Sequence, residues 1–211
     1  MSQFFAIHPV NPQPRLIRQA VEIIRGGGVI VLPTDSCYAL ACRVGDKAAT
    51  ERIRVIREVD SRHHFGLLCR NLAEAAVYAR IDDRQFRLIK SAARGAYAFI
   101  LHATREVPRR LLHPRRKTIG MRIPAHRVVH ALLTELGEPL LSSTLILPGD
   151  AAPLDDAQEI RVRLEHRVDL ILDGGSCGIV PTTVVDLTAG APVITRQGRG
   201  NAKLLGATVG T

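Results

Sequence analysis

An amphipathic helix pattern leads through three glycines directly into an aliphatic run and a proline. Apolar residues recur at the spacing of one helical face between residues 15 and 25. Gly26, Gly27 and Gly28 then supply the left-handed conformation in which many helices end. Residues 29–32 are typical of a buried strand, which Pro33 stops. The succession of helix, tight turn and buried strand predicts an α/β fold.

The same alternation of helix and strand patterns continues along the chain. Further helices are expected at 46–58, 82–93, 126–136 and 156–166, and Asp46 is the expected N-cap of the first of these. A short helix is also expected to begin at Asn71, whose spacing to Glu74 forms a capping box. Strands are expected at 38–44, 65–69, 96–103, 117–123, 139–145, 169–172, 183–187 and 193–196. Because the strands cluster late, we expect a twisted mixed sheet with helices packed on it, as a single domain over 1–211 with its core at about 15–200.

Composition indicates an aliphatic core and a basic protein. Aromatic residues make up 4% of the chain and Trp is absent, so aliphatic side chains must fill the interior. Lys and Arg number 29 against 20 Asp and Glu, and the resulting formal charge of +9 would attract RNA or nucleotides. A basic protein without such a partner would show the same excess of positive charge. The position of the charges along the chain must therefore distinguish the two interpretations.

Patterns for targeting and metal binding are absent from the sequence. No two of the four cysteines have Cys-x-x-Cys spacing, and the adjacent His63 and His64 are poorly placed to bind one metal ion. The chain begins MSQFFAIHP without a basic and apolar leader pattern, and no apolar run is long enough to cross a bilayer. We therefore expect a cytoplasmic protein with no membrane contact and no structural metal.

Polar side chains follow the first predicted strand. Thr34, Asp35 and Ser36 come directly after residues 29–32. The crevice beyond the carboxyl ends of strands is where α/β proteins bind ligands, and hydroxyls with one carboxylate could hold an amino-acid-like group. An ordinary turn favours the same residue types, so this segment alone is modest support for a site.

Arginine is concentrated later in the chain. The run 105–117 is the best local candidate for a surface that binds RNA phosphates, through Arg109, Arg110, Arg115, Arg116 and Lys117. A solvated basic loop explains this run equally well. Arg122 lies among apolar residues of a strand and needs an anionic partner, either an internal carboxylate or a ligand phosphate. Arg196 follows an apolar strand, and it could meet a ligand anion or pair with Asp186 or solvent.

Five segments, taken together, resemble a known family. They are GGVIVLPTDSCYALAC, PRRLLHPRRKTIGMRIP, GEPLLSSTLILPG, PTTVVDLT and ITRQG, between about Gln19 and Gly198. In order and spacing they resemble the YrdC/YciO family, most closely its YciO branch. The resemblance implies a YrdC/RibB-like α/β fold, with a twisted open mixed parallel/antiparallel sheet flanked by helices and a concave basic surface. It also favours a ligand, rather than a carboxylate of the chain, as the partner of Arg122.

Members of the YrdC branch are threonylcarbamoyl-AMP synthases, which join threonine, bicarbonate and ATP, release pyrophosphate and serve threonylcarbamoyladenosine formation in tRNA. Family members are also associated with double-stranded RNA. The resemblance therefore implies threonine, bicarbonate and ATP with Mg²⁺ as substrates, and tRNA or double-stranded RNA as a partner, for a monomer or homodimer. In this reaction the carbamate of threonine is itself the nucleophile, so the protein need supply only positioning and positive charge.

The resemblance also assigns site residues by position. It implies catalytic roles for Arg57 and Arg122, with Arg122 facing the threonine carboxylate or the phosphates. The implied substrate-binding residues include Arg196 on the nucleotide side and a threonine pocket lined by Thr34, Ser36 and Tyr38. The others in this group are Arg62, Thr144 and Thr182.

The chain departs from the synthase branch at two patterns. A Lys-x-Arg pattern is here Arg57 and Val59, although Arg62 could supply the missing charge. A Ser-x-Asn pattern is here Thr144 and Ile146, and the Ile146 side chain cannot hydrogen-bond. Because such contacts matter in a preorganised phosphate site, we expect weak or altered synthase activity. The alternative is a non-catalytic protein that binds double-stranded RNA, tRNA or ribosomal RNA.

Overall fold

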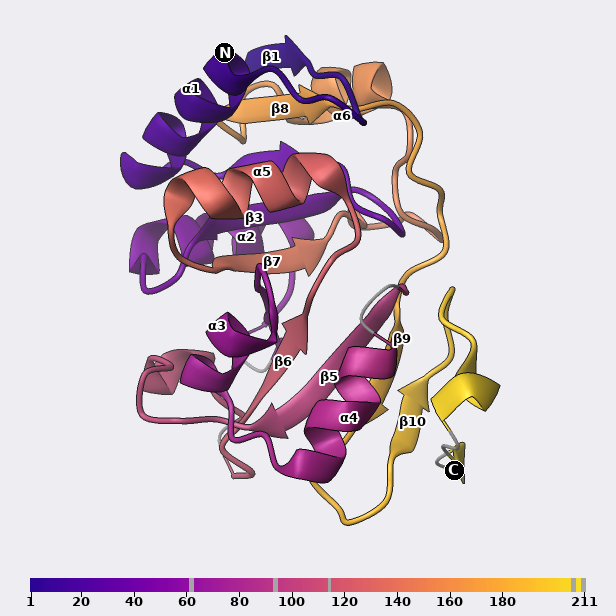
Figure 1. Cartoon of the computed structure of the whole chain (residues 1–211). Helices are drawn as coiled ribbons and strands as arrows, with labels where there is room; N and C mark the ends of the chain where they lie inside the picture. The colour runs from indigo at the N-terminus through magenta and orange to yellow at the C-terminus, as the bar shows by residue number, and fades with distance from the viewer. Residues whose placement is uncertain (61–62, 93–94, 114, 206–207, 210–211) are drawn as a thin grey trace.

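The strands form one sheet whose order in space differs from their order along the chain (Figure 1). The computed structural model describes residues 1–60, 63–92, 95–113, 115–205 and 208–209. The strands in these residues are β1 (Gln3–Ala6), β2 (Ile30–Leu32), β3 (Ala39–Arg43), β4 (Gly66–Leu68), β5 (Tyr97–His102), β6 (Thr118–Arg122), β7 (Leu140–Thr144), β8 (Leu170–Asp173), β9 (Thr183–Asp186), β10 (Val193–Arg196) and β11 (Thr208–Val209). Across the sheet they are arranged β1-β8-β2-β3-β7-β4-β6-β5-β9-β10-β11.

The sheet is mixed and is flanked by helices, as the sequence predicts. β2 pairs with β8 in parallel and with β3 antiparallel. The helices are α1 (Pro14–Arg25), α2 (Lys47–Arg57), α3 (Leu72–Tyr78), α4 (Asp83–Ala92), α5 (Arg127–Leu136) and α6 (Ala157–Leu164), with short 3-10 turns at Arg109–Leu111 and Ala202–Leu205. Of the helices in the described part of the chain, none has the length and apolar character needed to span a membrane.

The expected helices and strands are confirmed, with ends that shift by a few residues. Asp46 caps α2 by accepting the N–H of Ala49 at 2.9 Å, and Asn71 caps α3 in the same way. The capping box is only half formed, because the Glu74 carboxylate accepts the N–H of Arg70 instead of that of Asn71. Ala93, at the end of the expected 82–93 helix, lies outside the described residues.

Two layers of helices enclose the half of the sheet that contains β2, β3 and β8. α1 and α5 pack side by side on one face, where Ile24 and Leu132 are fully buried (Figure 1). α2 and α6 bury Ile53 and Ile160 in the cluster on the other face. The interior is aliphatic here, in line with the scarcity of aromatic residues.

In the described residues, helices cover the other half of the sheet on one face only. α4 lies over β5 in Figure 1, and Tyr97, Phe99 and Leu101 are buried in the same cluster as Ile89 of α4. The alternate residues of β5 point to the opposite face and are only partly buried. This uncovered face of β5 and its neighbours β6 and β9 gives the molecule room for a site.

Glycine is required where α1 ends. Gly27 has a φ of +85° and its N–H bonds to the carbonyl of Ile24, while the N–H of Gly28 bonds to the carbonyl of Ile23. This is a Schellman ending, in which the left-handed residue favours glycine. A Cβ on Gly28 would lie 2.5 Å from the Ile23 side chain and 2.7 Å from its carbonyl oxygen.

We therefore expect Gly28→Ala to lower the free energy of unfolding by about 1–3 kcal/mol, because the added methyl group overlaps Ile23. Gly26→Ala is the matched control, since its Cβ would meet nothing closer than 3.4 Å. Urea denaturation of the two variants measures the difference. Equal stability of both variants would show that the turn relaxes without cost.

Candidate functional site

A cavity of about 510 Å³ lies against the uncovered face of β5, β6 and β9. Ile100, Gly120 and Val184 of these strands line it. Separate parts of the chain bring four arginines to its wall, namely Arg57 at the end of α2, Arg116 before β6, Arg122 at the end of β6 and Arg196 at the end of β10. No Asp or Glu is among the described residues that line it. The cavity is therefore positively charged and partly screened from water, which favours an anionic ligand.

Neutral groups hold Arg57 in place. Its Nε donates to the carbonyl oxygen of Ile146 at 3.3 Å. Its Nη1 donates to Ser143 Oγ and lies 3.1 Å from His63 Nε2. Burial, and then the charge of Arg196, lower the pKa of Arg57. Within the described residues no carboxylate pairs with this guanidinium, so a bound anion would relieve its unfavourable position.

Arg196 is held in a similar way by Thr182. Its Nε and Nη2 donate to the carbonyl oxygen of Thr182 at 3.2 and 3.0 Å, and Nη2 also reaches the hydroxyl. Burial lowers the pKa of Arg196, Cys37 opposes this shift, and Arg122 adds to it. The possible pairing of Arg196 with Asp186 is not found.

Arg122 differs, because a carboxylate of the chain already neutralises it. Its Nη2 donates to Asp35 Oδ1 and, at 3.0 Å, to Ser36 Oγ. The two side chains of the ion pair are only 11% and 15% exposed. Of the two partners expected for Arg122, the structure shows the internal carboxylate, Asp35, and a ligand at this arginine stays a prediction. Burying an arginine requires a counter-charge, and the preceding loop supplies it.

The segment after β2 places its side chains in different environments. Thr34 and Ser36 are fully buried, and the Thr34 hydroxyl donates to the carbonyl oxygen of Cys37 at 2.6 Å within the turn. Tyr38 lines the cavity, and its phenol donates to the carbonyl oxygen of Gly175 at 2.9 Å. Their assignment to a threonine pocket stays a prediction.

Among the other assigned residues, Thr144 and Thr182 line the cavity. Ile146 also lines it and contributes a carbonyl oxygen to Arg57, although its side chain cannot form a hydrogen bond. Arg62 lies outside the described residues. The structure thus brings together Arg57, Arg122, Arg196 and both threonines, which are far apart in the sequence.

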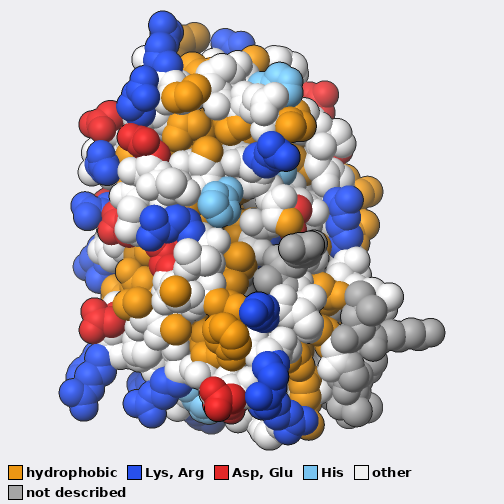
Figure 2. Space-filling model, in the orientation of Figure 1, with side chains coloured by type: hydrophobic (Ala, Val, Ile, Leu, Met, Phe, Trp, Pro, Cys, Tyr) orange, Lys and Arg blue, Asp and Glu red, His pale blue; other side chains and the backbone are white. Residues whose placement is uncertain are grey.

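The basic run 105–117 forms one rim of the cavity through Leu111, His113 and Arg116. All five candidate RNA-binding residues are exposed: Arg109, Arg110, Arg115, Arg116 and Lys117. Arg110 donates to the carbonyl oxygen of Gly45, and Arg116 pairs with Asp186 at 3.3 Å. On the face drawn in Figure 2, Lys and Arg side chains are scattered among acidic and apolar ones, without a single large patch. RNA binding by the run stays a prediction.

Two residues of the site were missed in the sequence. Ser143 Oγ lies 3.0 Å from His63 Nε2, and both contact Arg57. In the sequence, His63 was weighed only as a metal ligand, and the resemblance pointed to Thr144, the residue after Ser143. The neighbouring His64 stacks on His113 of the rim with 4.9 Å between ring centroids. This contact connects the rim to the segment that carries His63.

The pKa of His63 is lowered to about 4. Burial is the largest cause, followed by the charges of Arg57, Arg54 and His64, while Asp60 acts in the opposite direction. His63 is therefore neutral at physiological pH and offers a lone pair in the cavity.

A lowered histidine pKa predicts how stability depends on pH. Unfolded chains bind a proton at His63 near pH 6.5, whereas the folded protein resists it down to about pH 4. The contribution of neutral His63 to the free energy of unfolding is therefore complete above pH 6.5 and is lost as the pH falls toward 4. We expect the unfolding free energy of the wild type to fall more steeply over this range than that of His63→Gln. Parallel curves from denaturant titrations would contradict the assigned shift.

The side chains of the cavity do not fit a protein-bound Mg²⁺. This ion prefers carboxylate and phosphate oxygens. The described lining residues include no carboxylate, and no group of three or more His, Cys, Asp or Glu side chains in the described chain is arranged to hold a metal. A magnesium ion that arrives with a nucleotide would be held by the phosphates of that nucleotide.

Comparison with known proteins adds to this geometry. Residues 22–198 match the family model Sua5_yciO_yrdC, described as "Telomere recombination". Escherichia coli YciO (strain K12), an uncharacterised protein, is 56% identical over 203 residues, which cover 96% of this chain and 98% of YciO. The threonylcarbamoyl-AMP synthase of Chromobacterium violaceum is 32% identical, with 86% of this chain and 94% of the synthase covered.

Solved structures agree with these relatives. The crystal structure of Escherichia coli YciO superposes with a TM-score of 0.94 and covers 97% of this chain and 100% of that one. The structure of Pyrococcus abyssi Sua5 complexed with L-threonine superposes with a TM-score of 0.85. That protein is 24% identical, and the match covers 93% of this chain and 58% of Sua5. At this identity the likeness shows a shared fold.

Proposed function

Since the chain belongs to the Sua5/YciO/YrdC family, we propose that its cavity binds a nucleotide and supports a weak or altered form of the threonylcarbamoyl-AMP synthase reaction. The observation that carries the proposal is that Arg57 and Arg196 converge on one cavity without carboxylate partners among the described residues. Two guanidinium groups in a partly buried site suit the phosphates of ATP.

In this proposal the substrates carry the reactive groups. The carbamate formed from threonine and bicarbonate attacks the α-phosphate of ATP, and pyrophosphate leaves. Arg57 and Arg196 bind the phosphates and stabilise the charge that develops during transfer. Tyr38 and Thr144 bound the threonine end of the cavity, next to the buried Thr34 and Ser36. The reason to expect weak or altered activity is that Val59 and Ile146 stand where the synthase branch has polar residues. Asp35 adds to this, because it neutralises Arg122 and so weakens the attraction of Arg122 for the threonine carboxylate.

The direct test is pyrophosphate release from ATP by the purified protein, with threonine and bicarbonate each omitted in turn. We expect release that requires both co-substrates and is slower than that of the Chromobacterium violaceum synthase assayed alongside. Release no greater than that of heat-denatured protein would exclude the synthase reaction. Calorimetric titration with ATP then tests nucleotide binding separately from turnover.

The exposed arginines on the rim favour a second candidate function, the binding of duplex RNA. Phosphate contacts make such binding strongly salt-dependent. We expect Arg109→Gln combined with Arg115→Gln to weaken a duplex RNA gel shift and to reduce its dependence on salt. The matched control is Arg15→Gln combined with Arg18→Gln, which removes two exposed charges from α1. Equal effects of the two pairs would leave only nonspecific attraction to a basic protein.

A further inference from the structure

The hydroxyl of Ser143 contacts an arginine and a histidine, whereas several other buried hydroxyl groups donate to the backbone. The hydroxyls of Ser142, Thr34 and Thr183 each donate to a backbone carbonyl oxygen. Ser143 Oγ instead contacts Arg57 Nη1 and His63 Nε2, the latter at 3.0 Å. A guanidinium can only donate, so Arg57 Nη1, which lies 3.1 Å from His63 Nε2, requires that nitrogen to be the unprotonated acceptor of the ring, and the Ser143 hydroxyl can donate to it as well.

The histidine is arranged to receive this proton. His63 is neutral in the folded protein, because burial and the nearby Arg57 disfavour its charged form. The edge of its ring is set against Phe65, with the ring planes at 88° and the centroids 5.2 Å apart. The Nη1 of Arg57 donates to the serine oxygen and so stabilises negative charge that develops there. Hydroxyl and imidazole are thus within the reach that defines a nucleophile and its base.

We propose that Ser143 is a nucleophile with His63 as its base, and that the cavity hydrolyses a mixed anhydride of AMP with a carboxylic or carbamic acid. The proposal rests on the nucleotide site described above and adds a second activity to it. A base that is hard to protonate is a weak one, so the substrate must carry a leaving group that needs no proton. The phosphate of AMP meets this requirement, and Arg57 and Arg196 are placed to hold it.

The reaction has two stages, acylation of Ser143 and hydrolysis of the acyl-serine. Ser143 Oγ attacks the acyl carbon, its proton moves to His63 Nε2, the bond from the acyl carbon to the phosphate oxygen breaks, and AMP leaves as an anion. His63 then releases its proton to solvent. A water molecule attacks the acyl-serine and gives a proton to His63, which passes it to Ser143 Oγ as the ester bond breaks. The products are the free acid and AMP, with no oxidation or reduction.

Acetyl-AMP is a simple probe of this chemistry. We expect the wild-type protein to accelerate AMP release from acetyl-AMP and to carry an acetyl group on the peptide that contains Ser143, seen by mass spectrometry after an acid quench. Ser143→Ala should abolish the adduct and slow AMP release by about a hundredfold or more. Ser142→Ala is the matched control on the same strand, because its hydroxyl is committed to the carbonyl of Gly66. His63→Gln keeps a polar side chain but cannot take the proton, and it should slow formation of the adduct.

The outcomes separate this proposal from the nucleotide site. An adduct on Ser143 and its loss in Ser143→Ala would support the nucleophile. AMP release that persists in Ser143→Ala, or equal loss in Ser142→Ala, would overturn it. If the wild type binds ATP by calorimetry but releases no AMP from acetyl-AMP, the hydrolytic activity is excluded and the nucleotide site stands. If neither ATP binding nor AMP release is detected, both proposals fail.

Discussion

Replacing Arg57 with methionine is expected to weaken ATP binding by about 10- to 100-fold, since a charge-assisted hydrogen bond to phosphate contributes about 1.5–3 kcal/mol. Methionine keeps the unbranched stem of the side chain but removes the guanidinium, which no described carboxylate neutralises. Isothermal titration calorimetry with ATP at constant ionic strength measures the change. The affinity of the variant should also depend less on salt, because one fewer charge meets the phosphates.

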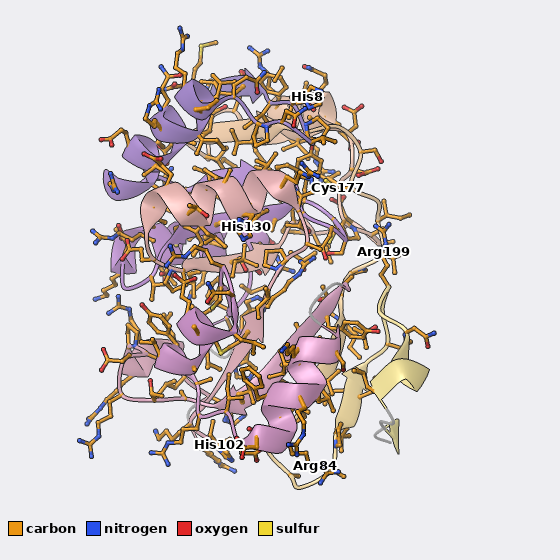
Figure 3. All side chains as sticks on the ribbon, in the orientation of Figure 1. His8, Arg84, His102, His130, Cys177 and Arg199 are labelled. Atoms are coloured by element: carbon orange, nitrogen blue, oxygen red, sulfur yellow. The ribbon has the colours of Figure 1, made fainter. Side chains whose placement is uncertain are left out.

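Arg84→Met is the matched control for this experiment. Arg84 lies on α4, which covers the opposite face of β5, and it donates to the carbonyl oxygen of Gly190 (Figure 3). The Arg84→Met substitution removes the same charge from the protein without changing a residue that lines the cavity. Equal losses of affinity in Arg57→Met and Arg84→Met would mean that overall charge, and not the cavity, attracts ATP. Thermal unfolding of both variants checks that neither effect reflects a damaged fold.

Asp35→Ala is expected to lower the free energy of unfolding by about 3–5 kcal/mol, because it leaves Arg122 partly buried without a counter-charge. The same change frees the Arg122 guanidinium, so inorganic phosphate should bind the variant more tightly than the wild type. Urea denaturation with and without phosphate measures both effects. Phosphate should therefore restore part of the lost stability.

The double variant Asp35→Ala with Arg122→Met separates charge from packing. Removing both charges is often close to neutral, so we expect it to be more stable than Asp35→Ala alone. If the double variant loses at least as much stability as Asp35→Ala, the loop after β2 depends on Asp35 for reasons other than the ion pair. In that case, neutralising the Arg122 guanidinium would not be the main structural role of Asp35.

Local patterns were enough to predict most of the fold. The aliphatic run of β2 is bounded by Gly28 and Pro33, which indicates a strand locally, and Asp46 caps α2 through a neighbour three residues away. β1 was missed because its four residues show little alternation, and its partner β8 lies far along the chain, with Gln3 opposite Leu170. Pairings of this kind are decided by tertiary contacts, which single-sequence periodicity does not contain.

The site was predicted only in part, for the same reason. An arginine within an apolar strand signals an anionic partner, yet Asp35 is 87 positions from Arg122, and the sequence could not choose between it and a ligand. His63 and Ser143 are 80 positions apart, so no spacing rule connects them. The resemblance located Arg57 and Arg196 because it carries three-dimensional information that the residues alone do not.

The interleaved strand order has a consequence for how the chain folds. β7 lies between β3 and β4, and β8 lies between β1 and β2. The N-terminal strands therefore form a continuous sheet only after strands from the second half of the chain have paired with them. Contacts between distant residues slow folding, because long loops must be ordered first. Arg57, Arg122 and Arg196 come from α2, β6 and β10, so the charge of the cavity is complete only when these distant segments have assembled.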